Sequence, residues 1–248
     1  MGKLVVTLDW PYTNIPWIWV SSLLASDVIK EPNVEFIRSQ TTDMNCSGNM
    51  LMRSAIERGA TEILAVSADQ SFPSDILSRL RAHNKDVVSA LAATRQVGHH
   101  WLAFNLNEKG IGMKANPKFP CEKVDIPSSG CVLYKAHIFN KVPPPWFKTT
   151  LTKDGTGIVQ TSDFYFFKKL KEYGIECYVD STLESYHQTE IYLSTTTLGR
   201  KLPYIDIIEN NDRIPCTSKD QDAIDDSPDW CNRYDSGSET TLTYMEGL

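Results

Sequence analysis

The sequence predicts an α/β fold, with a mixed, mainly parallel central sheet that is flanked by helices. Three short apolar segments rich in β-branched residues, at 3–8, 62–67 and 86–92, alternate with segments whose apolar residues recur at helical spacing. Strands that are apolar along nearly their whole length are typical of a parallel sheet with both faces covered. The 248 residues, 41% of them hydrophobic, suffice for one such domain with an appended segment.

The first half of the chain is expected to alternate strands and helices. After the strand at 3–8, Asn14 can cap a helix that has Pro16 in its first turn. Gly59 is a natural end for a later helix, because glycine adopts the left-handed conformation found there. The other elements expected are, in order, a strand at 34–39, a helix at 49–59, a strand at 62–67, a helix at 73–83 and a strand at 86–92.

Beyond residue 95 the alternation gives way to a more irregular region. The elements expected there are strands at 99–106, 123–126 and 129–134, a short helix at 135–139, a rigid turn at 143–147 with an exposed aromatic, a helix at 162–173 and a strand at 176–180 that a loop joins to His187. From about residue 203 the chain becomes acidic and loses periodicity. We therefore expect a domain at 1–202 and an acidic, partly irregular C-terminal extension at 203–248.

Composition argues against several classes of protein. The net charge of −6 does not favour binding to nucleic-acid backbones. The sequence has no stretch of about 18 apolar residues and no secretory signal, so we expect no membrane span and a cytoplasmic location. The six cysteines form no C-x-x-C pair, which argues against structural zinc and leaves disulfides open. The glycine-rich motifs of dinucleotide-binding and P-loop enzymes are absent.

Asp69 is the most informative polar residue. It follows the apolar strand at 62–67, and ligands of parallel α/β sheets bind outside the carboxyl ends of the strands. An ionised carboxylate at such a place needs a partner, and a divalent cation is a suitable one. The alternative is that Asp69 only begins the turn before the next helix, since aspartate is common in turns.

The segment around Asp69 resembles the D-x-D region of GT-A glycosyltransferases, in which an apolar strand, D-x-D, an aromatic-proline pair and a helix follow one another. The chain is similar to compact, family 2-like members of this group, of a viral or phage type, over residues 3–193. The likeness continues in order with Arg95 after the fourth strand, Ser129 and Gly130 before a strand of the sugar pocket, Trp146 in a P-W-F turn, Asp163 at a helix start and His187 after the last strand. Two positions depart from the family pattern, because Ser67 replaces the first aspartate of D-x-D and Ser162 replaces the glutamate of an E-D pair.

The resemblance implies that Asp69 and His187 hold a divalent metal ion. An aspartate with a histidine is more typical of Mn²⁺ than of Mg²⁺, so Mn²⁺ is favoured and Mg²⁺ is the alternative. Asp163 is implied as the catalytic base, which the helix dipole would keep ionised; a single base favours inversion, although retention stays open. Simpler roles also stay open: His187 as a hydrogen-bonded surface residue, Asp163 as a helix cap and Trp146 as core packing.

The donor nucleotide is expected across the ends of the first two strands. Residues placed there by position in the fold are Thr7, Leu8, Asp9, Ser39 and Gln40, and Asn49 and Arg53 on the next helix are expected to reach the base or the phosphates. The donor pocket is completed in this interpretation by Ser67, Ala68, Arg95, Ser129, Gly130 and Trp146.

The expected reaction is transfer of a hexose from a UDP-sugar, UDP-glucose or UDP-galactose being favoured, to a hydroxyl acceptor that the sequence does not identify. Hydrolysis of the UDP-sugar is kept open as a side reaction, and a viral enzyme would act in the host cytoplasm. A nucleotidyltransferase is a weaker alternative, because residues 9–12 lack its glycine-rich loop. A non-catalytic nucleotide-sugar or carbohydrate-binding protein is a second alternative, suggested by the serines at 67 and 162.

Overall fold

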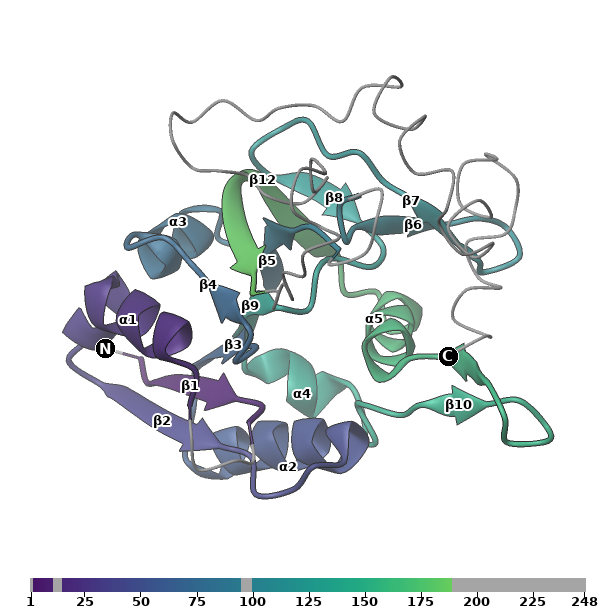
Figure 1. Cartoon of the computed structure of the whole chain (residues 1–248), viewed down its shortest axis with the longest axis horizontal. Coiled ribbons are helices and arrows are strands. Elements are labelled where there is room, and N and C mark those ends of the chain that lie inside the picture. The colour runs from purple at the N-terminus through teal and green to yellow at the C-terminus, as the bar shows by residue number, and fades with distance from the viewer. Residues whose placement is uncertain (1, 11–14, 95–99, 189–248) are drawn as a thin grey trace, which may run out of the picture.

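An eight-stranded sheet forms the centre of the protein, and helices lie on both of its faces (Figure 1). The structure is a computed structural model, and it describes residues 2–10, 15–94 and 100–188. The acidic segment at 203–248 and Arg95 lie outside the described residues. The predicted fold class, a mixed α/β protein with a large, mainly parallel central sheet, is confirmed.

The first half of the chain follows the predicted alternation. Its elements are β1 (Leu4–Leu8), α1 (Trp17–Ala25), the 3₁₀-helix η1 (Asp27–Lys30), β2 (Val34–Arg38), α2 (Met44–Glu57), β3 (Glu62–Val66), β4 (Gln70–Ser71), α3 (Ile76–Ala82) and β5 (Val87–Ala92). The second half contains β6 (Phe104–Leu106), β7 (Gly112–Lys114), β8 (Glu122–Val124), β9 (Cys131–Lys135), α4 (His137–Lys141), β10 (Thr150–Leu151), β11 (Ile158–Gln160), α5 (Ser162–Glu172) and β12 (Cys177–His187).

The strands of the central sheet are ordered β2-β1-β3-β9-β5-β12-β4, and β8 also pairs with β12. Strands β2, β1, β3, β5 and β12 run in one direction, whereas β9, β8 and β4 run in the other. The insertion of antiparallel β9 between β3 and β5 explains why the chain pattern becomes irregular after residue 95. The carboxyl ends of β1, β2 and β3 meet at one edge of the sheet, where ligands of such folds bind.

Two hydrophobic layers hold the helices on the sheet. Because side chains of a strand alternate between its faces, Val6 of β1 faces one layer and Val5 faces the other. The first layer contains Trp19 of α1 and Leu77 of α3, and the second contains Met52 of α2 and Phe166 of α5. All five residues of β1 are buried, which is why this strand is apolar nearly throughout.

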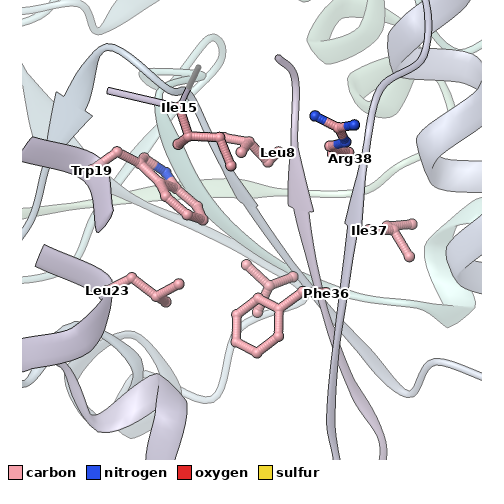
Figure 2. A pocket seen from close by; sticks show the side chains of 8 residues that line it. Leu8, Ile15, Trp19, Leu23, Phe36, Ile37 and Arg38 are labelled. Carbon is pink, nitrogen blue, oxygen red and sulfur yellow. The ribbon is translucent and has the colours of Figure 1, made fainter. Parts of the chain in front are cut away.

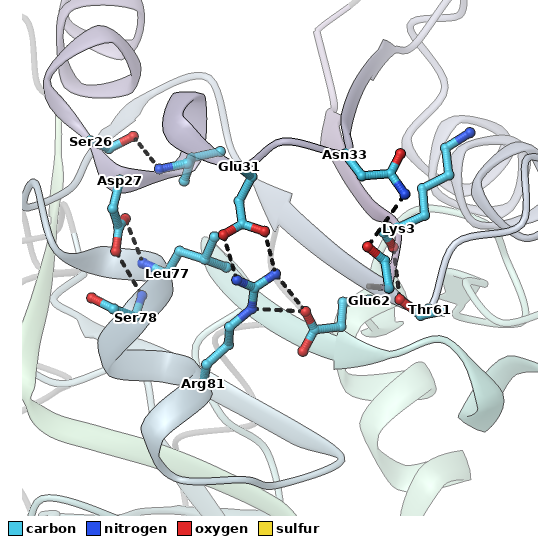
Figure 3. A network of polar contacts seen from close by, with 12 residues as sticks. Lys3, Ser26, Asp27, Glu31, Asn33, Thr61, Glu62, Leu77, Ser78 and Arg81 are labelled. Carbon is cyan, nitrogen blue, oxygen red and sulfur yellow. Dashed lines mark hydrogen bonds and ion pairs between the residues drawn. The ribbon is translucent and has the colours of Figure 1, made fainter.

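Polar contacts join the helices of the first layer to the sheet (Figure 3). The carboxylate of Asp27 accepts hydrogen bonds from the backbone N–H groups of Leu77 and Ser78, at 3.0 and 2.8 Å, and so caps the start of α3. The guanidinium of Arg81 binds Glu31 at 2.8 Å and Glu62 at 2.7 Å. These contacts fix η1, α3 and β3 relative to one another.

The strand β12 is longer than predicted. The expected loop between Asp180 and His187 is wrong, because the strand runs to His187 with a shift in its pairing to β5 between Asp180 and Glu184. At the shift, the buried carboxylate of Asp180 accepts hydrogen bonds from the N–H of Thr182 at 2.8 Å and from Nε2 of His83 at 2.8 Å. These bonds stabilise an irregular backbone that the sequence pattern does not reveal.

Two further predictions are corrected. The second helix begins at Met44 and not at Asn49, because the side chain of Asp43 accepts a hydrogen bond from the N–H of Cys46 at 2.7 Å and caps the helix earlier. The turn at 143–147 exposes no aromatic, because Trp146 is only 5% exposed and packs edge-on against Phe139.

Candidate functional site

The pairing of β4 with β12 brings Asp69 and His187 together. Strand β4 starts directly after Asp69, and its residue Gln70 is paired with His187. The backbone N–H of Gln188 donates a hydrogen bond to the carbonyl oxygen of Asp69 at 2.7 Å. The backbones of the two predicted metal ligands, 118 positions apart in the chain, therefore lie side by side just beyond the carboxyl end of β3.

Hydrogen bonds fix the imidazole of His187 in one tautomer. Its Nδ1 lies 2.5 Å from the carbonyl oxygen of Ala93, which can only accept, so Nδ1 carries the proton. Its Nε2 is then the acceptor for the side-chain amide of Gln70, 2.7 Å away. A backbone carbonyl on the far nitrogen is the usual arrangement for a histidine that presents its other nitrogen to a metal.

Gln70 is an organising residue that sequence reasoning missed. Its side chain is buried, its Oε1 accepts a hydrogen bond from the hydroxyl of Ser185, and its amide nitrogen contacts His187. A Cβ atom at Gly130 would lie 1.8 Å from that nitrogen, so only glycine leaves room for Gln70 to cross. In the sequence Gln70 is one of two polar residues between Asp69 and Phe72, and that pattern does not reveal its contacts.

The predicted donor-pocket residues around Gly130 gather at the same place. The N–H of Ser67 donates to the carbonyl oxygen of Gly130 at 2.8 Å, which joins the segment after β3 to the segment before β9. Ala68 follows Ser67 and is buried. Ser67 and Gly130 thus form one wall, and the side chain of Gln70 lies against Gly130.

Asp163 lies in the first turn of α5 and is connected to this wall through Ser129. The hydroxyl of Ser129 donates to Oδ2 of Asp163 at 3.3 Å. The other oxygen, Oδ1, accepts from the N–H of Phe164 at 2.9 Å and from the hydroxyl of Thr161. The carboxylate is therefore fixed by three donors and remains partly exposed to solvent.

The residues expected to hold the nucleotide meet only in part. The N–H of Ser39 donates to the carbonyl oxygen of Leu8 at 2.9 Å, so the ends of β1 and β2 do lie together. The side chains of Thr7, Leu8 and Ser39 are buried, whereas Gln40 is exposed. Asp9 accepts a hydrogen bond from Ser47 on α2; burial raises the pKa of Asp9, and this bond only partly opposes the rise.

Asn49, Arg53 and Trp146 do not join this group. The amide of Asn49 holds the turn before β10, donating to the carbonyl oxygen of Phe147 and accepting from the N–H of Trp146, both at 2.7 Å. The indole of Trp146 donates to the carbonyl oxygen of Val142 at 2.7 Å inside the core. Arg53 is exposed. Along the axis of α2 it lies about 9 Å beyond Ser47, the residue that contacts Asp9.

The described part of the chain contains no cluster of three or more His, Cys, Asp or Glu side chains that could hold a metal ion. Its four cysteines, Cys46, Cys121, Cys131 and Cys177, are free thiols. None of the helices in residues 2–10, 15–94 and 100–188 has the length and apolar character needed to cross a membrane.

Comparison with known proteins identifies the fold. No protein-family model and no curated protein sequence matches the chain. It is similar to the crystal structure of A197 from STIV, with a TM-score of 0.55 and 12% identity over 76% of this chain and 86% of that one. It is also similar to the crystal structure of GalNAc-T7 with UDP, GalNAc and Mn²⁺, with a TM-score of 0.52 and 10% identity over 77% of this chain and 44% of that one. The chain thus spans less than half of GalNAc-T7 and has a fold like that of a GT-A glycosyltransferase.

Proposed function

We propose that the protein is a metal-dependent glycosyltransferase that transfers a hexose from a UDP-sugar to a hydroxyl acceptor. The observation that carries this proposal is the meeting of Asp69 and His187 at the end of β3 through the β4–β12 pairing. The glycosyltransferase-like fold supports it, and the GalNAc-T7 neighbour was crystallised with UDP, GalNAc and Mn²⁺.

Asp69 and His187 are the residues that would hold the metal. One carboxylate and one imidazole nitrogen suit Mn²⁺ better than Mg²⁺. The tautomer of His187 puts a lone pair on Nε2, which metal binding requires, and the amide of Gln70 would have to move off that lone pair for a metal to bind. Two protein ligands leave positions for diphosphate oxygens and water. The bound ion would stabilise the negative charge that develops on the leaving nucleoside diphosphate.

Asp163 is the residue proposed to accept the proton of the acceptor hydroxyl. Its partly exposed carboxylate lies in the first turn of α5 and is oriented by the hydroxyls of Ser129 and Thr161. A single base of this kind suits direct displacement with inversion. The wall of Ser67 and Gly130 connects this base to the proposed metal ligands.

The test is UDP binding by the Asp69→Asn variant, measured by titration calorimetry with and without MnCl₂. We expect Mn²⁺ to strengthen UDP binding by the parent protein and to have no such effect on the variant, because the carboxylate ligand is lost. Asp75→Asn is the matched control, since Asp75 is exposed and caps α3 with no side-chain hydrogen bond. If Mn²⁺ strengthens UDP binding by Asp69→Asn as much as by the parent, the proposed metal site is refuted.

The alternative is a non-catalytic protein that binds a nucleotide-sugar or a carbohydrate with the same fold. Serines at 67 and 162 in place of acids favour it, as does the hydrogen bond from Gln70 to the nitrogen proposed to bind the metal. Incubation with UDP-glucose and UDP-galactose in MnCl₂ distinguishes the two. UDP release by transfer or hydrolysis supports the enzyme, and saturable binding without any UDP release supports the alternative.

A further inference from the structure

A cavity of about 230 Å³ lies between α1 and the edge of the sheet formed by β1 and β2 (Figure 2). None of the residues of the Asp69–His187 group lines it. The described residues that line it are apolar except for Arg38 and the indole N–H of Trp19, and they are Val6, Leu8, Ile15, Trp19, Leu23, Phe36, Ile37 and Arg38. The cavity exists because β2 is an edge strand and α1 covers it incompletely, which leaves Phe36 45% exposed.

Trp19 gives this cavity an unpaired hydrogen-bond donor. The side chain is only 5% exposed, and its indole N–H has no hydrogen-bond partner in the described part of the chain. Buried polar groups are nearly always paired, so this N–H is a candidate donor to a bound ligand. Figure 2 shows the indole nitrogen on the side of the ring nearer Ile15 and Leu8, which also line the cavity.

The polar groups of the cavity are at one end. Arg38 and Leu8 are the last residues of their strands, and in Figure 2 the guanidinium and the indole nitrogen lie toward that end, whereas Leu23 and Phe36 lie toward the other. An indole N–H and a guanidinium can only donate hydrogen bonds. Because the indole N–H has no partner among the described residues, the chemistry selects a ligand whose head group accepts hydrogen bonds and whose remainder is apolar.

We propose that this cavity binds a small amphiphile, an acyl chain with a carboxylate or ester head group at the Trp19–Arg38 end. A cavity of about 150 Å³ holds benzene, so this volume holds roughly nine non-hydrogen atoms. A longer chain can leave the cavity past Phe36, which lines it and is 45% exposed.

Sodium octanoate is the probe, because the octanoate anion has ten non-hydrogen atoms, and titration calorimetry measures its binding to the full chain. We expect saturable binding at one site. Leu23→Phe should abolish it by filling the cavity, and Leu151→Phe, the same change on an exposed leucine of β10, should leave it unchanged. Trp19→Phe retains a ring but lacks the N–H, and should weaken binding by roughly tenfold. Circular dichroism checks that each variant is folded.

A free fatty acid and a membrane lipid both offer an acyl chain with a carboxylate or ester head group. Sedimentation with phosphatidylcholine–phosphatidylglycerol vesicles distinguishes these two sources of the ligand. Sedimentation that Leu23→Phe abolishes identifies the lipid as the source, whereas octanoate binding without sedimentation identifies a free acid. The proposal is overturned if neither probe binds the parent, or if Leu23→Phe binds octanoate as tightly as the parent does. Competition by UDP would also overturn it, since the cavity would then belong to the nucleotide site. None of these binding experiments requires enzyme turnover, so they test the cavity independently of the proposed glycosyltransferase activity.

Discussion

Asp163 illustrates how one side chain can be prepared for chemistry by short-range contacts. Replacement by asparagine keeps its shape and removes its basicity, so Asp163→Asn should lower the turnover number by about 10²-fold or more and leave UDP binding in MnCl₂ nearly unchanged. Steady-state kinetics and calorimetry measure the two effects. Asp154→Asn is the control. Asp154 also accepts hydrogen bonds from threonine hydroxyls, those of Thr152 and Thr156, but it lies in the exposed turn between β10 and β11. Equal turnover by the two variants would contradict the role of Asp163.

Single residues were predictable where a local pattern accompanies them. Asp69 stands directly after an apolar strand, and Asp163 stands at the start of a periodic helical segment, so their positions follow from neighbours in the chain. Gln70 has no such pattern, because its partners His187 and Gly130 are distant in sequence. Asn49 was assigned to the nucleotide for its amide, yet that amide is used by the turn at Phe147.

At the scale of elements, the contact between β4 and the start of β9 predicts a sharp steric effect. In Gly130→Ala the new methyl group would overlap the amide of Gln70, so we expect a loss of about 1–3 kcal/mol in the free energy of unfolding. Urea denaturation measures it. In the double variant Gly130→Ala/Gln70→Ala the overlap is absent, and the loss should be smaller than the sum of the two single changes. Strictly additive losses would show that the contact is not the cause.

The ends of elements were less predictable than their existence. Strand β1 is buried on both faces, and its run of apolar residues is visible without any tertiary information. The sequence predicts the start of α2 at Asn49, whereas the hydrogen bond from the N–H of Cys46 to Asp43 starts the helix at Met44. The sequence predicts a loop after Asp180 because the pairing shifts there and the buried face beyond the shift carries the polar Ser185.

For the whole molecule, buried carboxylates predict how stability depends on pH. Burial raises the pKa of Asp180, but hydrogen bonds from Thr182 and His83 lower this pKa by more than burial raises it. The pKa of Asp180 is therefore below its ordinary value. Burial also raises the pKa of Glu62, but the hydrogen bonds and charges of Lys135 and Arg81 outweigh the effect of burial, so this pKa is also below its ordinary value. A carboxyl with a lowered pKa in the folded state binds fewer protons than in the unfolded state, so it stabilises the fold above the ordinary pKa.

The free energy of unfolding should therefore fall as the pH decreases from about 5 toward 3. Urea denaturation across this range measures the slope. Asp180→Asn should be less stable than the parent at pH 7 and should show a shallower pH dependence, since one of the linked groups is gone. Asp75→Asn, which changes an exposed carboxylate, should follow the parent curve. An Asp180→Asn curve parallel to that of the parent would rule out this carboxylate as a contributor.

The β4–β12 pairing also has a consequence for how the protein is made. Gln70 and His187 are 117 positions apart, and His187 is the last residue of β12. A nascent chain that has emerged as far as α5 already contains β1, β2 and β3, together with Asp69, but has no imidazole to set beside that carboxylate. If the Asp69–His187 pair binds a cation, as we propose, it does so only after translation has passed residue 187, so this pair cannot guide the early co-translational steps of folding.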